Sequence, residues 1–493
     1  MAEQSLKEKT AKGLFWGGVS SGAQQLIGAL FGIFFARLLS REDYGLVGML
    51  AIFTGVVAVL QNSGFISALI NKKDAGHKDY NAVFWFSTAV GILSYVVLFL
   101  CAPLIANFFH AEELKNASRV LFLWFLVGGL CTSHNAILSK KMMVKERANI
   151  MIISLLLSNT VGLTLALLGF AYWALILQTV LHYVIGTALT WHYVKWRPTF
   201  SFDIQPLKEM FPFSCKVLIT GLFSVMNANI FSVLLGRFYT KSELGDYTQG
   251  NKWAFLGYTF INNSLTGIVH PVLAEVSDDR DRLRNVFRKM VRFVSFVSFP
   301  CMLGLAFIAK EFIVVTVSDK WLPSVPIMQL LCIWGAFIPI VSLYSYLFIS
   351  KGKSDINMWS SVAIGLLQLL IAWLMLPHGI LHMVLAYVST NILSLFVLHA
   401  WVRQQIGYRF LDLLKDILPF ILITLLVLSG TYFATQSVTN LYLLLSLKIV
   451  LAASLYVLIL KVIKVSIFKE SIEYLLKRKN GKRSGKGSEK GTM

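Results

Sequence analysis

One apolar stretch of this chain carries a row of polar side chains headed by a cation. The stretch Phe211–Phe238 is long enough to cross a bilayer. At 100° per residue, four polar residues fall within about 80° of one another: Lys216, Thr220, Ser224 and Asn227. A lysine at the bilayer centre costs about 2.5 to 3.5 kcal/mol, so this row should face protein or water, where it can bind an anion. The alternative is that Lys216 lies near the membrane surface and extends its ammonium group there.

Three other apolar stretches carry polar residues at helical spacing. Such side chains suit the hydroxyl groups of a sugar, but in membranes they also join helices to one another. We keep both interpretations, and we take Gln24, Asn62, Asn262 and His270 as predicted ligand-binding residues. The full set is Ser20, Ser21, Gln24, Gln25 and Gly28 in the first stretch, Gln61 and Asn62 at the end of the second, and Tyr258, Asn262, Thr266 and His270 in the eighth.

Carboxylates are missing from the middle of every apolar stretch. All 25 Asp and Glu residues lie in predicted loops or within about a turn of a predicted helix end, the deepest being Glu275 and Glu311. Proton or sodium coupling usually relies on a carboxylate inside the membrane. Any coupling would therefore have to use His182, His270 or a phosphate of the transported solute.

The sequence predicts neither a metal site nor a cofactor. The five cysteines form no CxxC or other ligand spacing, and we interpret them as apolar packing residues. His378 and His382 are four residues apart, but they flank a turn at Gly379 and lack a third ligand.

The composition places the chain in a membrane. Of its 493 residues, 56% are hydrophobic and 14% charged, whereas about a quarter of the residues of a soluble protein are charged. We predict an all-α integral membrane protein with fourteen spans, although the fifth with the sixth and the eleventh with the twelfth are alternatively re-entrant hairpins. The predicted spans are 12–36, 44–70, 82–106, 118–138, 149–169, 171–194, 212–236, 254–276, 290–309, 326–349, 358–376, 380–402, 417–435 and 441–463.

The basic residues alternate with the predicted spans. With the N-terminus placed inside, the inside segments hold 34 of the 45 Lys and Arg residues and the outside loops hold 9. We therefore expect a multi-pass protein with both termini cytoplasmic, and the net charge of +20 does not require nucleic acid as a partner. The basic tail should lie on anionic lipid or be solvated, and Lys448 is interpreted as extending to the outer surface.

The chain repeats itself at an offset of 200 residues. FGIFFARLLSREDYG at 31–45 resembles FSVLLGRFYTKSELG at 231–245, and a second echo aligns Trp124 with Trp334. Because six predicted spans separate the copies, both copies enter the membrane from the same side, which is a parallel repeat. We predict a six-helix lobe at 1–200, a second at 201–410, two further helices at 411–465 and a cytoplasmic tail at 466–493.

Several of these segments resemble the polysaccharide transporter family, the Wzx-type flippases. That family belongs to the MOP superfamily, which also holds the MATE drug exporters and the lipid II flippases. The resemblance covers roughly residues 5 to 410. It rests on ARLLSREDYGLVGMLAIF, GFISALINKKD, Phe84 with Trp85, FSVLLGRFYTKSELGDYTQGNK and FPCMLGLAFIAKEFIVVTVSDKWLPSVPIMQLL.

This resemblance implies a fold of twelve to fourteen helices and an activity. The activity is movement of an undecaprenyl-pyrophosphate-linked oligosaccharide from the cytoplasmic to the outer leaflet of a bacterial inner membrane by alternating access. The implied partners are that lipid-linked oligosaccharide, membrane lipids and other polysaccharide-assembly proteins. One departure matters: Phe231 stands where many members have an Asp, so ion coupling assigned to that Asp does not carry over.

Arg37 and Arg237 occupy equivalent positions of the repeat, at the outer ends of their predicted helices. As a pair they would form a basic rim that binds the pyrophosphate on the outer side. It is equally consistent with the sequence that each caps the negative C-terminal end of a helix dipole.

Two other classes of protein compete with a flippase. A MATE-like exporter of cationic drugs would prefer carboxylates and aromatic residues in its cavity, whereas the predicted cavity is basic. A membrane enzyme would need a sizeable outer loop with paired catalytic groups. The longest predicted outer loop, about Arg237 to Trp253, is too short for an active site.

Overall fold

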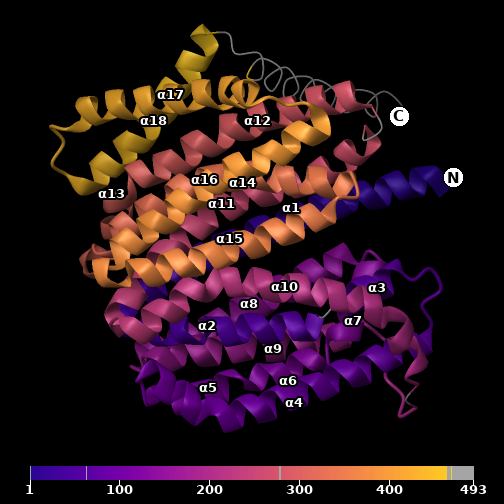
Figure 1. Ribbon diagram of the computed structural model, residues 1–493. Helices are drawn as coiled ribbons and strands as arrows, with labels where there is room; N and C mark the ends of the chain where they lie inside the picture. Colours follow the sequence, from indigo (N-terminus) through magenta and orange to yellow (C-terminus); the bar gives the residue numbers. More distant parts are fainter. Residues whose placement is uncertain (1, 63, 202, 277–278, 464–467, 469–493) are drawn as a thin grey trace, which may run out of the picture.

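The protein is a bundle of long helices. The computed structural model describes residues 2–62, 64–201, 203–276, 279–463 and 468, and these residues contain no β-strand (Figure 1). The helices are α1 (Ala2–Leu38), α2 (Arg41–Asn62), α3 (Phe65–Asn71), α4 (His77–Phe109), α5 (Glu113–Leu121), α6 (Leu123–Gly129), α7 (Thr132–Lys140), α8 (Val144–Leu167), α9 (Tyr172–Tyr193), α10 (Gln205–Phe238), α11 (Lys241–Glu275), α12 (Arg280–Phe307), α13 (Ala309–Thr316), η1 (Asp319–Trp321), α14 (Ser324–Ser350), α15 (Ser354–Met375), η2 (Leu376–His378), α16 (Ile380–Ile406), α17 (Phe410–Thr435) and α18 (Leu441–Val462).

Many of these helices are long and apolar enough to cross a membrane. Among the described residues eleven meet this condition, or up to twelve if one bent pair counts as a single span. The predicted number of fourteen is therefore not confirmed; α1 and α11 are long helices but are not among the eleven. The two tight pairs, α8 with α9 and α15 with α16, are full-length helices in that set and not re-entrant hairpins.

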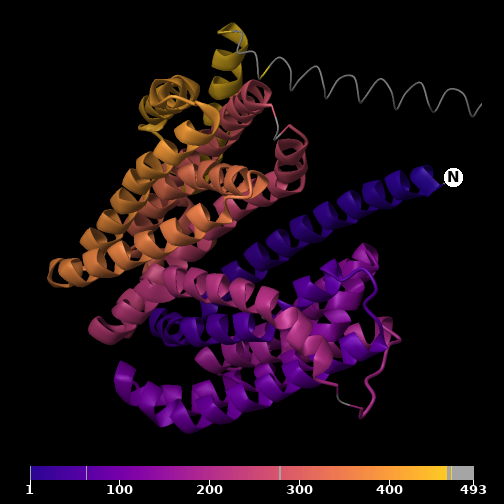
Figure 2. The same ribbon diagram turned by 45° about the vertical axis from the view of Figure 1, so that its right-hand side comes forward.

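The helices form two groups with α1 and α10 between them. We call α2–α9 the N-half and α11–α16 the C-half. The first face is the end of the bundle where α1 begins, and the second face is the end where α1 finishes. The two groups converge toward the second face and separate toward the first (Figure 2). Helix α10 contacts the N-half where Val225 meets Gly55 of α2, and it contacts the C-half where Asn227 bonds to Ser361 of α15. The division at residues 200 and 410 stays a prediction.

The prediction of an outer loop from Arg237 to Trp253 is wrong, because helix α11 begins at Lys241. The polar residues that suggested a loop form the start of a helix. Thr240 and Glu243 make reciprocal bonds, from the Thr240 backbone N–H to the carboxylate (3.0 Å) and from the Glu243 backbone N–H to the Thr240 hydroxyl (3.2 Å). Ser40 and Asp43 do the same before α2, with distances of 2.8 and 3.1 Å. The sequence echo therefore encodes two copies of one helix start.

The two helix starts cross at a matched pair of glycines. A Cβ atom on Gly45 would lie 2.0 Å from the carbonyl oxygen of Lys241, and one on Gly245 would lie 1.9 Å from that of Arg41. Any side chain there would force the backbones of α2 and α11 apart. An ion pair between Arg41 and Asp246 spans the same crossing. The N-half and the C-half thus meet at the second face through symmetry-related backbone contacts.

We predict that Gly45→Ala and Gly245→Ala lower the melting temperature of the purified protein. Overpacking typically costs about 1 to 3 kcal/mol, and here the opposing atom is a backbone oxygen that cannot rotate away. Gly28→Ala is the matched control, because a Cβ at Gly28 meets no atom within 4 Å. Equal melting temperatures for all three variants in detergent would contradict the role of the crossing.

Helices α17 and α18 pack on the outer side of the C-half (Figure 1). Lys448 of α18 does not extend to the surface as predicted: its Nζ lies 2.7 Å from Glu311 of α13, and both side chains are about nine-tenths buried. The reason is that a lysine buried among helices is stabilised more by a carboxylate partner than by reaching for distant water. At the other end of this pair of helices, Asp416 of α17 accepts from Arg288 and pairs with Arg292 of α12, each at 2.8 Å. The predicted tail at 466–493 lies outside the described residues apart from Phe468.

We predict that Glu311→Gln destabilises the protein by about 3 to 5 kcal/mol, because removing one partner leaves a buried charge uncompensated. The double variant Glu311→Gln/Lys448→Met should recover most of that loss. The comparison is of unfolding midpoints for the wild type, both single variants and the double variant. Strictly additive effects would show that the two residues do not interact.

Candidate functional site

The end of α1 is fixed to the C-half at the second face. The Arg37 guanidinium donates to the carbonyl groups of Val315 and Thr316, both at 2.7 Å, and so caps the end of α13. Lys320 donates in return to the carbonyl oxygens of Arg37 and Leu39, at 2.8 and 2.7 Å. These hydrogen bonds satisfy carbonyl groups at the ends of α13 and α1 and join the two helices at this end of the bundle.

The repeat-equivalent Arg237 makes the corresponding contact with the N-half. Its guanidinium bonds to the His110 ring and lies 5.4 Å from the centre of the Phe108 ring. Lys241 adds an ion pair to Glu113, at 2.7 Å. The structure thus places Arg37 and Arg237 on the same face, as expected, but both guanidinium groups are engaged by protein. Their role as a pyrophosphate-binding rim stays a prediction.

A different cation, Lys252 of α11, lies between the halves. A Cβ atom on Gly32 would lie 2.6 Å from its Nζ, so the ammonium group rests against the backbone of α1. The rings of Tyr44 and Trp253 are centred 5.6 and 5.7 Å from the same atom. Lys252 is half-buried and lies about 16 Å along α11 from the start of that helix at Lys241, on the second face.

Lys252 is a cation without a carboxylate partner. Within the described part of the chain its ammonium group has two aromatic neighbours and makes no ion pair. The buried hydroxyl of Tyr44 and the indole N–H of Trp253 also have no hydrogen-bond partner. An unpaired ammonium group is costly where water is excluded, and a bound anion would offset the charge of Lys252.

Lys252 occupies a position at which the two copies of the repeat differ. At the offset of 200 residues its counterpart is Ile52 of α2, so the cation is present in only one half. The predicted outer loop, about Arg237 to Trp253, includes Lys252, and the repeat alignment described above ends before it, at Gly245. A search for polar residues that break the repeat would have found it.

The predicted polar row on α10 is only partly described. Lys216 and Thr220 lie in α10, but their side chains are outside the described part of the structure. Ser224 is exposed, and Asn227 donates to the backbone carbonyl of Ser361 on α15 at 3.0 Å. Asn227 therefore joins two helices, and its role in binding a ligand stays a prediction.

The side chains of two of the remaining predicted residues are described, Gln24 and Asn262. Gln24 is exposed on α1, and Asn262 is half-buried on α11. The side chains of Asn62 and His270 lie outside the described part of the structure. All of these residues stay predictions as ligands.

A contact at the first face fixes α10 to the N-half. Lys72, just after α3, bonds to Asp79 of α4 (2.8 Å) and to Glu209 of α10 (2.9 Å). These two hydrogen bonds raise the pKa of Lys72 and keep its charge in place.

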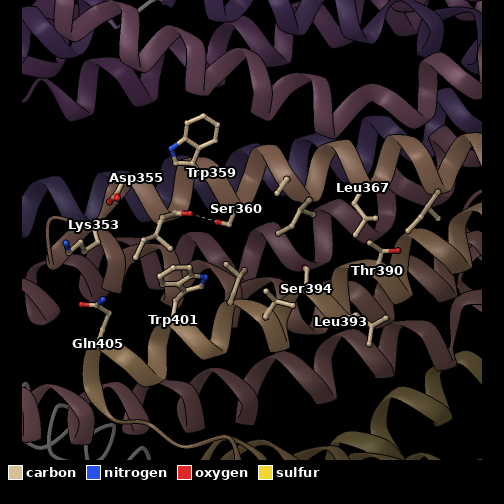
Figure 3. A pocket seen from close by; sticks show the side chains of 16 residues that line it. Lys353, Asp355, Trp359, Ser360, Leu367, Thr390, Leu393, Ser394, Trp401 and Gln405 are labelled. Carbon is tan, nitrogen blue, oxygen red and sulfur yellow. Dashed lines mark hydrogen bonds between the residues drawn. The ribbon is translucent and has the colours of Figure 1, made fainter.

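An apolar groove of about 710 Å³ runs between α15 and α16 (Figure 3). Lys353, Asp355 and Gln405 lie at its first-face end. The hydroxyl groups of Ser360 and Thr390 bond to carbonyl groups of their own helices, at 2.6 and 2.7 Å. The groove therefore presents a hydrocarbon-like wall, suited to a lipid chain and unsuited to a polar headgroup.

Comparison with known proteins places these features in context. Residues 34–326 match the family described as polysaccharide biosynthesis protein. The chain belongs to this family. It is similar to the teichuronic acid biosynthesis protein TuaB of Bacillus subtilis, with 26% identity over 72% of this chain and 74% of the relative. It is also similar to the lipopolysaccharide biosynthesis protein WzxC of Escherichia coli, with 23% identity over 72% of each chain.

Solved structures show the same fold. The lipid II flippase MurJ in an inward closed conformation superposes with a TM-score of 0.76 at 17% identity, over 92% of this chain and 99% of MurJ. An inward-facing MATE-family multidrug transporter superposes with a TM-score of 0.62 at 16% identity, over 78% of this chain and 94% of the transporter. This polysaccharide biosynthesis protein is therefore a multi-pass membrane protein with the fold of the MOP transporters. The predicted family and fold class are confirmed.

For this polysaccharide biosynthesis protein, we predict that Asp246→Asn loosens the second face. The substitution leaves Arg41 without its carboxylate, and the two helix starts lose their ionic contact. Spin labels at Asn116 of α5 and Asp319 of η1 should report a longer and broader distance distribution in the variant. Asp281→Asn, which removes an exposed pair with Arg284 at the first face, is the control and should leave the distribution unchanged.

Proposed function

We propose that the protein is a flippase that moves an undecaprenyl-pyrophosphate-linked oligosaccharide across a bacterial inner membrane. The observation that carries the proposal is Lys252, a cation between the two halves with no carboxylate partner in the described structure. A pyrophosphate loses its hydration on entering a membrane, and a desolvated cation with neighbouring O–H and N–H donors offsets that cost.

The family supports the same substrate class. Its relatives TuaB and WzxC are named for the biosynthesis of teichuronic acid and lipopolysaccharide, and MurJ is named as a flippase of lipid II. The substrate of this chain would be a lipid-linked repeat unit of an O-antigen, a capsule or an exopolysaccharide.

The charge distribution gives the direction. The segments assigned to the inside hold 34 Lys and Arg against 9 assigned to the outside, or 8 once Lys252 is placed within α11, so the first face would be cytoplasmic, with both termini. The second face, closed by the α2–α11 crossing and by the Arg37 and Arg237 contacts, would then be the outer gate. Alternating access would open that gate while the first face closes. Other polysaccharide-assembly proteins would receive the lipid outside.

A MATE-like exporter of cationic drugs shares the fold but fits the site less well. Its substrate would meet the ammonium group of Lys252, with like charges facing each other in a low dielectric. An enzyme is not supported, since the curated relatives and the structural neighbours that we describe are named for biosynthesis, flipping or transport.

The test is transfer of fluorescent undecaprenyl-pyrophosphate oligosaccharide between leaflets of proteoliposomes. We predict that Lys252→Met slows transfer about tenfold or more, because a hydrogen bond to a charged group contributes about 1.5 to 3 kcal/mol. Lys216→Ala tests the predicted polar row of α10 in the same assay. Lys141→Met, which removes an exposed cation, is the control for surface charge.

The outcomes separate the candidates. If the wild type moves none of a panel of lipid glycans but exports an organic cation, the drug-exporter function replaces the flippase. Equal transfer by wild type and Lys252→Met would remove Lys252 from the site. Loss in Lys216→Ala alone would place the phosphate on α10 instead.

A further inference from the structure

The N-half contains a polar cavity of its own, separate from the space between the halves. It measures about 330 Å³, room for roughly ten water molecules. All of its walls come from the N-half: α2, α3 and α6–α9. Its lining is Ala58, Gln61, Ile66, Trp124, Gly128, Cys131, Thr132, Asn135, Leu138, Ser139, Arg147, Ile150, Met151, Ser154, His182, Tyr183, Gly186, Thr187 and Thr190.

A broken span forms one wall of this cavity. The segments Glu113–Gly129 and Thr132–Lys140 meet at a bend of 49°, which frees backbone carbonyl groups near the break. Gln61 donates to the carbonyl of Phe125, and the Trp191 indole donates to that of Leu130 at 3.1 Å. Irregular backbone at membrane depth occurs where it is covered by protein or lines a wet cavity, and broken helices often form transport sites.

Several polar groups of the lining have no partner in the protein. The Nδ1 atom of His182 is buried and makes no hydrogen bond. Within the described residues, no side-chain hydrogen bond is made by Asn135 or Arg147. If His182 and Asn135 served only to join helices, their polar groups would be paired, whereas the exposed Arg147 can be solvated. Their hydrogen-bonding capacity instead points into space that a polar occupant can fill.

The donor and acceptor set identifies the kind of occupant. The lining contains no Asp or Glu, which argues against a cation. Asn135, Gln61 and a neutral His182 each offer both a donor and an acceptor, as a sugar hydroxyl does, whereas an anion requires mainly donors. The stacked rings of Trp124 and Tyr183, centred 4.1 Å apart, add a flat apolar surface of the kind that ligand sites combine with a few polar groups.

We propose that this cavity binds one sugar unit of the lipid-linked glycan. The inference rests on the proposed flippase function and adds to it a carbohydrate subsite in the N-half. Arg147 is exposed in the first turn of α8 at the first face, where the charged part of the substrate enters. A single hexose ring would occupy the cavity and satisfy His182 and Asn135. The site selects substrates by their sugar, while Lys252 recognises the pyrophosphate that all of them share.

The experiment compares binding of two lipids to the protein in nanodiscs. One is undecaprenyl pyrophosphate, and the other is the same lipid bearing a single glucose, galactose or N-acetylglucosamine. We expect the wild type to bind at least one glycosylated lipid about tenfold more tightly than the bare lipid. Asn135→Leu and His182→Phe should bring that ratio close to one without changing the affinity for the bare lipid.

Asn159→Leu is the matched control in the same half. Asn159 is a buried asparagine of α8 whose amide bonds to the Leu155 carbonyl of its own helix (2.6 Å), and it does not line the cavity. This variant should keep the wild-type ratio. A ratio of one in the wild type for all three sugars, or loss of binding for both lipids alike in the cavity variants, would overturn the inference.

A second measurement needs no substitution. Cys131 lines the cavity, and its alkylation by iodoacetamide can be followed by peptide mass spectrometry beside the other four cysteines. The preferred glycosylated lipid should protect Cys131, and the bare lipid should not. Equal protection by both lipids counts against a sugar site. The proposed function fails separately, if the wild type moves none of the lipid glycans in the transfer assay.

Discussion

The close crossing of α2 and α11 is the constraint on which the rest of the architecture depends. Two backbones pass each other with no room for a side chain, at Gly45 against Lys241 and at Gly245 against Arg41. This contact fixes the second face, orients both halves and lets them diverge toward the first face. The Arg37, Lys320 and Arg237 contacts reinforce an arrangement that the glycines make sterically possible.

The internal repeat explains how the two halves pack, and a position where the two copies differ explains the candidate ligand site. The helix starts of α2 and α11 are built alike, with the same reciprocal bonds at Ser40 and Thr240. Lys252 has Ile52 as its counterpart, and such asymmetry has no use in the crossing itself. An internal duplication that first supplied two equal halves would leave one of them free to acquire a cation.

Much of the frame could be predicted from the sequence. The apolar stretches predict the helices, because their length is a local property of the sequence. The alignment of Gly45 with Gly245 indicates the repeat, because the similarity is visible in the residues themselves. The start of α11 was missed because polar residues such as Glu243 and Asp246 resemble a loop until their capping and pairing partners are known. For the same reason Lys448 was assigned to the surface: its partner Glu311 is distant in sequence.

The candidate site was less predictable than the frame. Composition indicated a basic membrane protein, and the polar row of α10 pointed to the helix that separates the halves. Whether a polar side chain faces a ligand or another helix depends on which helices pack together, and Asn227 shows that the answer cannot be taken from helical spacing. The N-half cavity lies beside a bend in one span, and no residue pattern that we identified predicts that bend.

The buried pair of Glu311 and Lys448 also bears on how the chain is assembled during synthesis. Glu311 enters the membrane long before α18 has left the ribosome, so an unpaired carboxyl group must wait there for its partner. Arrival of Lys448 would then supply the counter-charge and fix the last helix in place. A chain that stops before α18 would keep an unmatched acidic group inside the bilayer, a mark by which membrane quality control can recognise an unfinished protein.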